Sequence, residues 1–140
     1  MITYIKGDLL EANTDVICHQ VNLEGVMGGG LAYSIARKYP KVNKVYKNYI
    51  PKQLGEVCFA DTKDFTIANC FSQTEDYDTD YKALKLCLYK VKGYMISCKY
   101  SRVAIPYKYG CGIANGDWKK VLSVFEEVFK GFNVLIYVKE

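Results

Sequence analysis

Hydrophobic and polar positions follow two different periods along the chain, and the change from one to the other predicts strands and helices in alternation. Short apolar runs typical of strands lie at 2–6, 15–21, 56–62, 65–70, 102–106 and 133–138. Apolar residues recur at helical spacing over 31–39, 42–50 and 81–99, and again from Asp117 to Gly131. This alternation predicts an α/β domain in which helices cover a central, mostly parallel or mixed sheet.

The length of 140 residues predicts one domain, spanning residues 1–140, because a chain of this size buries about two-thirds of its unfolded surface. No apolar run is long enough to cross a membrane, and the first residues lack the apolar core of a signal peptide. We therefore expect a cytoplasmic monomer with no membrane partner. The six cysteines form no C-x-x-C pair and mostly lie inside apolar runs, so we interpret them as buried thiols and expect no metal or other cofactor.

The net charge of +4 is a mild excess of positive charge. Lysines are spread over 38–52 and 82–92, as on solvated helix faces, and no block of five or more basic residues occurs. The charge suits an anionic small ligand. A nucleic-acid partner is not expected, because an RNA-binding interpretation would rest only on mild basicity and many tyrosines, without clustered arginines or a known RNA motif.

One stretch, 15–40, passes from a strand through a glycine loop into a helix. Gly25, Gly28, Gly29 and Gly30 leave bare backbone N–H groups at the positive end of the helix that begins near Leu31, where phosphate is the natural ligand. The spacing matches neither G-x-G-x-x-G nor a P-loop. Three consecutive glycines could instead form only a tight connection between packed elements.

Polar side chains support the interpretation of this glycine loop as a binding site. His19, Gln20 and Asn22 come directly before the loop, at a strand end. A second glycine-bearing loop follows the strand at 102–106, and in a parallel sheet both loops fall on the same edge, where they could hold one ligand from two sides. Asp8 follows the first strand and could accept a hydrogen bond from an adenine amino group or a ribose hydroxyl, or simply bond its own backbone.

Five segments in this order resemble the macro domain family: KGDLL at 6–10, ICHQVN at 17–22, GVMGGGLAYSIARKYP at 25–40, IANCFSQ at 67–73 and IPYKYGCGIANGDW at 105–118. The resemblance spans nearly the whole chain. It is strongest to the branch that contains the phage and fungal ADP-ribose 1''-phosphate phosphatases and the terminal ADP-ribose protein glycohydrolases. It implies a three-layer α/β/α fold with a central mixed sheet, and ADP-ribose or ADP-ribose 1''-phosphate as the ligand.

The resemblance also implies which residues contact the ligand. Asp8 and Leu9 match the family's contact to adenine, while Asn22 and the 28–30 loop match the part that holds the distal ribose and pyrophosphate. The segment 109–113 resembles the second diphosphate loop. The ligand-binding residues that we expect are Asp8, Leu9, Gln20, Gly28, Gly29, Gly30, Leu31, Tyr109, Gly110, Cys111, Gly112 and Ile113.

His19, the only histidine, and Asn22 are the candidate catalytic residues. His19 matches a histidine that the fungal phosphatase relatives use in their site, and an imidazole could transfer a proton or only donate a hydrogen bond. The lysine and the acid of the glycohydrolase branch are missing, since the corresponding positions read Cys70-Phe71-Ser72 and Ala114. The expected function is hydrolysis of ADP-ribose derivatives, as in ADP-ribose 1''-phosphate phosphatases. A non-catalytic ADP-ribose reader and a hydrolase acting on ADP-ribosylated protein are the alternatives.

Overall fold

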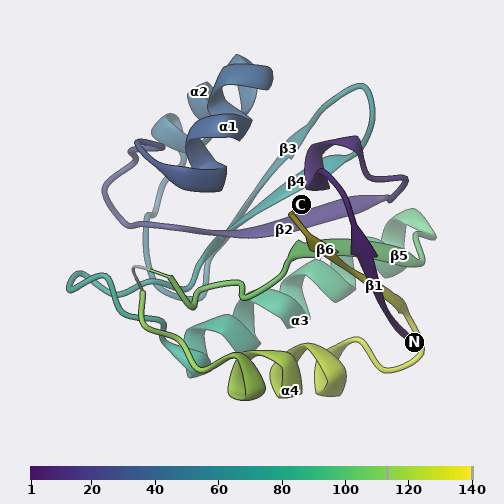
Figure 1. Ribbon diagram of the computed structural model, residues 1–140. Coiled ribbons are helices and arrows are strands. Elements are labelled where there is room, and N and C mark those ends of the chain that lie inside the picture. The colour runs from purple at the N-terminus through teal and green to yellow at the C-terminus, as the bar shows by residue number, and fades with distance from the viewer. Residues whose placement is uncertain (113, 140) are drawn as a thin grey trace.

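The computed structural model of the chain describes residues 1–112 and 114–139 and consists of one six-stranded sheet covered by helices on both faces (Figure 1). The strands are β1 (Ile2–Lys6), β2 (Val16–Val21), β3 (Val57–Asp61), β4 (Thr66–Phe71), β5 (Arg102–Pro106) and β6 (Asn133–Val138). Their order across the sheet is β1-β6-β5-β2-β4-β3. All neighbours are parallel except β3 and β4, which form an antiparallel hairpin at one edge. The sheet is therefore mixed, as the sequence predicts.

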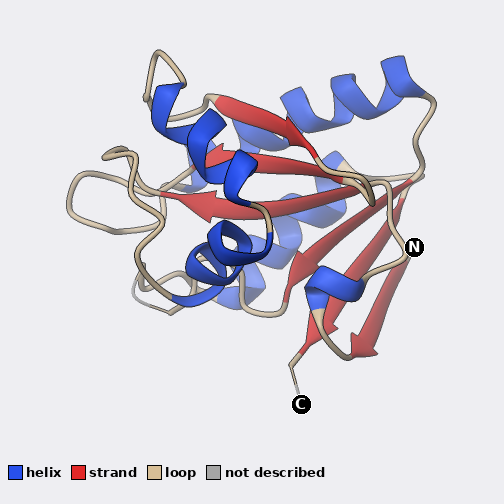
Figure 2. Ribbon diagram, turned by 90° about the horizontal axis from the view of Figure 1, so that it is seen from above, coloured by secondary structure: helices blue, strands red, loops and turns tan. Residues whose placement is uncertain are grey.

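Helices cover the two faces of the sheet as two separate layers. The helices α1 (Gly30–Lys38) and α2 (Pro40–Asn48) lie on one face, and α3 (Tyr81–Cys98) and α4 (Trp118–Val128) lie on the other (Figure 1). Alternate residues of β2 point to opposite faces: Val16 and Cys18 pack beneath α3 and α4, whereas Ile17 and Val21 pack beneath α1 and α2. The predicted three-layer α/β/α fold is confirmed, and Figure 2 shows the twisted sheet between its helices.

The ends of the helices follow from local chemistry. Asp80 and Asp117 cap α3 and α4, because their carboxylates accept hydrogen bonds from the N–H groups of Ala83 at 2.8 Å and Lys119 at 3.0 Å. Pro40 starts α2 at its first position, where a missing N–H costs no hydrogen bond. The last helix ends at Val128 rather than at Gly131, since the chain turns before β6. Among the described residues, no helix is both long and apolar enough to span a membrane.

Candidate ligand-binding site

The carboxyl ends of three parallel strands and the start of α1 enclose a cavity of about 590 Å³. Its walls come from the turn after β1, the short 3-10 helix η1 (Leu9–Glu11), α1, the end of β5 and the end of β6. The lining residues are Gly7, Asp8, Leu9, Leu10, Gly30, Leu31, Ser34, Pro106, Tyr137 and Lys139. A cavity of this size at the carboxyl edge of an α/β sheet is typical of a small-molecule site.

Asp8 occupies the β1 side of this cavity. Its Oδ1 accepts a hydrogen bond of 2.9 Å from the N–H of Leu10 and so caps η1. The cap fixes the carboxylate at the cavity wall, and its second oxygen keeps lone pairs for a further donor. Leu9 and Leu10, both 6% exposed, supply an apolar surface beside it. A flat, partly polar group such as a nucleobase fits a carboxylate set among apolar side chains.

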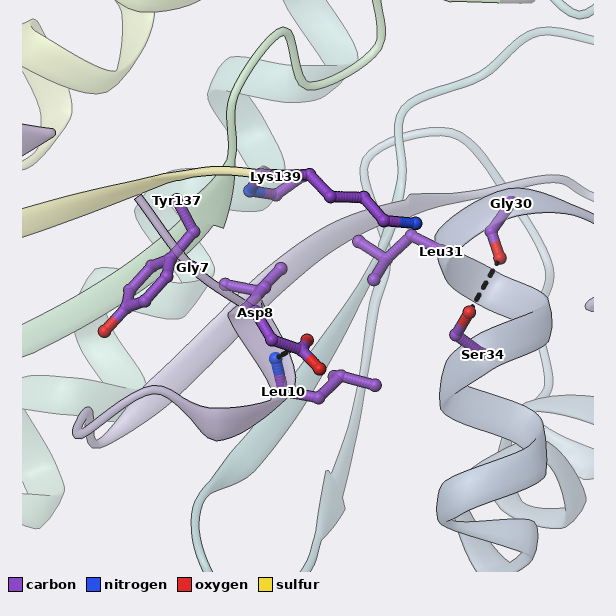
Figure 3. Close-up of a pocket in the computed structure, with 10 residues that line it drawn as sticks. Gly7, Asp8, Leu10, Gly30, Leu31, Ser34, Tyr137 and Lys139 are labelled. Carbon is purple, nitrogen blue, oxygen red and sulfur yellow. Dashed lines mark hydrogen bonds between the residues drawn. The ribbon is translucent and has the colours of Figure 1, made fainter. Parts of the chain in front are cut away.

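The start of α1 forms the opposite wall of the cavity. Gly28, Gly29 and Gly30 are exposed, and Gly30 and Leu31 line the cavity together with Ser34 (Figure 3). Within the described part of the chain, no acceptor is bonded to the N–H groups of the first α1 residues, since they precede the first intrahelical hydrogen bond, which Tyr33 makes to Gly29. This wall therefore offers N–H donors and the positive end of a helix dipole to an anion.

The end of β6 adds a cation to the mouth of the cavity. Tyr137 and Lys139 come from this last strand, and the Lys139 side chain extends from it toward Leu31 and Gly30 of α1 (Figure 3). An ammonium group near helix N–H donors reinforces the preference for a negatively charged ligand. The cavity thus combines one carboxylate, apolar walls and a positive end.

Asn22 holds the glycine loop in shape through its own side chain. Its Nδ2 donates to the Val26 carbonyl at 2.9 Å, and its Oδ1 accepts from the Glu24 N–H at 3.0 Å. The Tyr46 hydroxyl lies 2.6 Å from both the Oδ1 and the carbonyl oxygen of Asn22 and accepts a hydrogen bond from the Gly25 N–H. Asn22 therefore braces the 22–26 turn that leads to the glycines.

Gln20 holds two other loops together. Its Nε2 donates to the Ser72 Oγ at 3.1 Å and to the Thr79 Oγ1 at 3.2 Å, and Thr79 in turn donates to the Gly110 carbonyl at 2.6 Å. Gly110 has a φ of +68°, and a Cβ added there would lie 2.7 Å from the Thr79 Oγ1. A glycine is required at this position by close packing between loops and by the positive φ.

The second predicted phosphate loop, 109–113, lies outside the cavity walls where it is described. Tyr109 is 1% exposed, and its hydroxyl lies 2.8 Å from that of Ser72, so its ring is part of the core under α4. Burial raises the pKa of the half-buried Cys111 thiol, whose Sγ donates to the Tyr109 carbonyl. Gly110 and Gly112 do not line the cavity, and Ile113 lies outside the described residues.

His19 is enclosed on the α1 and α2 face of the sheet, with 2% of its surface exposed. Its Nε2 lies 2.6 Å from the Asn69 Oδ1, while the Asn69 amide donates to the Cys58 carbonyl at 2.9 Å. Because the Asn69 oxygen must accept, the His19 Nε2 carries the proton and Nδ1 is the acceptor. Burial lowers the pKa of His19 from 6.5 to about 4, and the bond to Asn69 opposes this only in part. The ring is therefore neutral at physiological pH.

The structure brings four of the predicted residues to one cavity and distributes the others around it. Asp8, Leu9, Gly30 and Leu31 line the cavity, and Gly28 and Gly29 lead into it. The sequence interpretation missed the other six lining residues, which are Gly7, Leu10, Ser34, Pro106, Tyr137 and Lys139. A weak signal existed for Gly7, Pro106, Tyr137 and Lys139, because residues at the carboxyl ends of parallel strands lie at the same end of the sheet. Nothing in the sequence marks Ser34 or Leu10 in this way. Within residues 1–112 and 114–139, His, Cys, Asp and Glu side chains form no group of three that could hold a metal ion.

Comparison with known proteins identifies the family. The Macro domain family model matches residues 18–125. The fold matches the macrodomain of Mycobacterium tuberculosis DarG with a TM-score of 0.83 and 27% identity, covering 98% of this chain and 97% of the other. The family match covers most of the chain, so the chain belongs to the macro domain family, in agreement with the resemblance seen in its motifs.

Two curated relatives carry functional names. The chain is 29% identical to the ADP-ribose 1''-phosphate phosphatase of Candida albicans over 169 aligned positions, covering 99% of both proteins. It is 44% identical over 57 residues to the DNA ADP-ribosyl glycohydrolase of M. tuberculosis, a match that covers 41% of this chain. That match spans only 16% of the mycobacterial protein, so the chain corresponds to a small part of it.

Proposed function

We propose that this macro domain binds ADP-ribose in the cavity between β1, β6 and α1 and hydrolyses derivatives that carry a group on the distal ribose. The cavity is the observation that carries the proposal. It places the Asp8 carboxylate at one end and the N–H groups of Gly30 and Leu31 at the other. A nucleoside diphosphate presents an amino group and two negatively charged phosphates, which complement these two ends.

The proposed orientation follows from the chemistry of the walls. Adenine lies among Leu9, Leu10 and Tyr137, with its amino group donating to Asp8, because these walls are apolar around one carboxylate. The diphosphate lies against the start of α1, where Lys139 balances its charge. Gly28 and Gly29 then border the distal ribose. The contacts of Gln20, Tyr109, Gly110, Cys111 and Gly112 with the ligand stay predictions.

The names of the relatives describe different reactions, and both support ADP-ribose as the ligand. One name describes a phosphatase of ADP-ribose 1''-phosphate and the other a glycohydrolase of ADP-ribosylated DNA, so ADP-ribose is common to both substrates. The full-length match to the fungal phosphatase favours phosphate release as the reaction of this chain. Hydrolysis of ADP-ribosylated protein and simple binding of ADP-ribose are the alternatives.

The catalytic roles of His19 and Asn22 stay predictions, and their contacts define what each would do. The neutral, buried His19 has a low pKa and is a weak base at neutral pH, so it would act by fixing Asn69 within β4 rather than by exchanging protons. Asn22 would act by holding the 22–26 turn, and through it the glycines that face the distal ribose. Both are positioning roles.

We further propose that the domain works as a monomer in the cytoplasm. The support for the cytoplasm is chemical, because all six cysteines are free thiols and four of them are buried, which suits a reducing compartment. Sedimentation at micromolar concentration tests the monomer, and a stable dimer would contradict it.

Calorimetric titration with ADP-ribose tests the binding, and two product assays test the chemistry. Wild type should bind ADP-ribose, and saturation at about 100-fold the dissociation constant should stabilise the fold by about 2.7 kcal/mol. Release of inorganic phosphate from ADP-ribose 1''-phosphate should exceed release of ADP-ribose from a modified protein. Binding without turnover of either substrate would favour a reader, and absence of heat on titration would remove ADP-ribose as the ligand.

A further inference from the structure

The α1 and α2 layer carries a concentration of positive charge that the overall net charge of +4 conceals. Residues 25–60 contain six lysine and arginine residues but a single acid, Glu56. Glu56 bonds Tyr49 and pairs with Lys90 of α3, on the far side of the sheet. Among the described residues of this layer, only Lys38 forms a salt bridge, to Glu11. The remaining basic side chains of α1 and α2 keep their charge for an external partner.

Three lysines form the solvent face of α2. Val42 and Tyr46 are fully buried against the sheet, whereas Lys41, Lys44 and Lys47 are exposed. At 3.6 residues per turn, these lysines lie within one third of the helix circumference, opposite the buried side, and span about 9 Å along the axis. Several phosphates of one nucleic-acid strand fit into that length.

The helix α1, which lies on the same face of the sheet as α2 (Figure 1), adds an exposed tyrosine and an arginine to this layer. Tyr33 is 46% exposed, and Arg37 donates to its hydroxyl at 3.1 Å, with the guanidinium carbon 5.8 Å from the ring centroid. Ser34, the next residue after Tyr33, lines the cavity. An exposed aromatic ring beside an arginine, in a layer that also carries exposed lysines, is a combination that suits single-stranded nucleic acid, because a base can stack on the ring while phosphates meet the cations.

The opposite layer lacks this arrangement although it is also rich in lysine. On α3, Lys85 and Lys90 are paired with Glu127 and Glu56. Its exposed face also presents Leu86, Tyr89 and Ile96, which interrupt the charge. It lies across the sheet from α1, so it does not lead to the cavity by way of Ser34 (Figure 1). Two of the four lysines of α3 are thus paired with acids, whereas none of the three lysines of α2 forms a salt bridge within the part of the chain that the structure describes.

We propose that the face formed by Tyr33, Arg37, Lys41, Lys44 and Lys47, here called the basic face, binds single-stranded nucleic acid. The inference rests on the proposed function where it names a substrate class: a strand lying on this face would present an attached ADP-ribose group to the cavity. The partner is a nucleic acid rather than an acidic protein, because the face combines cations at regular spacing with a ring that is 46% exposed and has an arginine on one side. This proposal reverses the expectation from the sequence, in which the spread of lysines indicated only solvated helix faces and no nucleic-acid partner.

Fluorescence anisotropy with a labelled, unmodified oligodeoxythymidine of about 12 nucleotides tests the basic face. The test variant is Lys41→Gln/Lys44→Gln/Lys47→Gln. The matched control, Lys82→Gln/Lys119→Gln/Lys130→Gln, removes the same charge from exposed positions of the opposite layer. We expect wild type and control to bind alike at low salt and the test variant to bind at least tenfold more weakly. For the test variant, the slope of log affinity against log salt concentration should be less steep by about 2, because three lost phosphate contacts each contribute about 0.7 to the slope.

Further measurements separate binding at the basic face from binding at the cavity and from non-specific attraction of negative charge. Tyr33→Ala should weaken binding of the oligonucleotide about fivefold or more if a base stacks there. Calorimetry with ADP-ribose on all variants reports the cavity independently, so loss of oligonucleotide binding with retained ADP-ribose binding assigns the effect to the basic face. Equal losses in test variant and control, no binding by wild type, or displacement by polyglutamate at equal charge concentration would each overturn the proposal.

Discussion

The burial of His19 predicts a specific dependence of stability on pH. The pKa of this imidazole falls from 6.5 in the unfolded chain to about 4 in the fold. The unfolded chain therefore binds a proton more tightly than the folded chain, and the free energy of unfolding decreases as the pH falls through this range. Each unit of difference in pKa corresponds to about 1.4 kcal/mol, so the full penalty below pH 4 is about 3 kcal/mol.

At pH 5 the expected loss relative to pH 7 is about 2 kcal/mol, which is a substantial part of the stability of a small domain. Because His19 is the only histidine, no other imidazole titrates between these values. Urea unfolding at pH 7 and pH 5, followed by circular dichroism, measures the difference between the two free energies.

His19→Gln is the matched variant, since a glutamine amide can still donate to the Asn69 oxygen but does not titrate. Its free energy of unfolding should change far less between pH 7 and pH 5 than that of wild type. The reasoning is refuted if wild type is equally stable at both pH values, or if the free energy of unfolding of the variant changes between them as much as that of wild type.

Three further changes test the loops around the cavity. Gly29→Glu should abolish ADP-ribose binding in calorimetry, because it puts a negative charge into the anion site. The melting temperature should stay within a few degrees, because a Cβ at this position meets no atom within 4 Å. Retained affinity would remove this loop from the site. Gly110→Ala should lower the free energy of unfolding by about 1–3 kcal/mol, because of strain at the positive φ and contact with Thr79. Gly112→Ala should cost much less, because its Cβ meets no atom within 4 Å. Equal effects of the two variants in thermal unfolding would contradict the packing argument. Tyr46→Phe should cost about 1–2 kcal/mol and weaken ligand affinity by loosening the turn at Asn22, and unchanged affinity would separate that turn from the site.

The sequence predicts the elements of this fold well because each depends on local patterns. The apolar runs at 2–6 and 133–138, the helical spacing over 81–99 and the helix that begins at Asp117 are all visible without a partner. The placement of two glycine loops at one sheet edge also follows, since β2 and β5 are parallel neighbours. These features need only period, capping and the direction of strands.

The detailed site could not be predicted because it depends on contacts between distant residues. His19, Gln20 and Asn22 look alike in sequence, as polar residues before a glycine loop. The structure separates them by their partners: Asn69 for His19, Ser72 and Thr79 for Gln20, and Tyr46 for Asn22. Each polar group near the core must find a hydrogen bond, and only the folded chain shows where.

Lys139 was missed for a related reason. Nothing near the last strand marks it as functional, because its position beside the cavity arises from the pairing of β6 with β1 and β5. Strand order across the sheet is set by packing among elements far apart in the sequence. The cavity is therefore a property of the topology, and the residues at both of its strand-derived walls become visible only once that order is known.

The parallel pairing of β1 with β6 has a practical consequence for experiments on this domain. The chain enters β1 at the amino ends of the parallel strands, where the Met1 amino group donates to the Phe132 carbonyl at 2.7 Å, and leaves β6 at their carboxyl ends, beside the cavity. A purification tag or fluorescent protein joined after Lys139 would emerge at the mouth of the cavity and compete with a ligand for space. The same addition placed before Met1 would emerge at the other end of these strands, away from the cavity. Ligand-binding assays should therefore use fusions at the amino-terminal side.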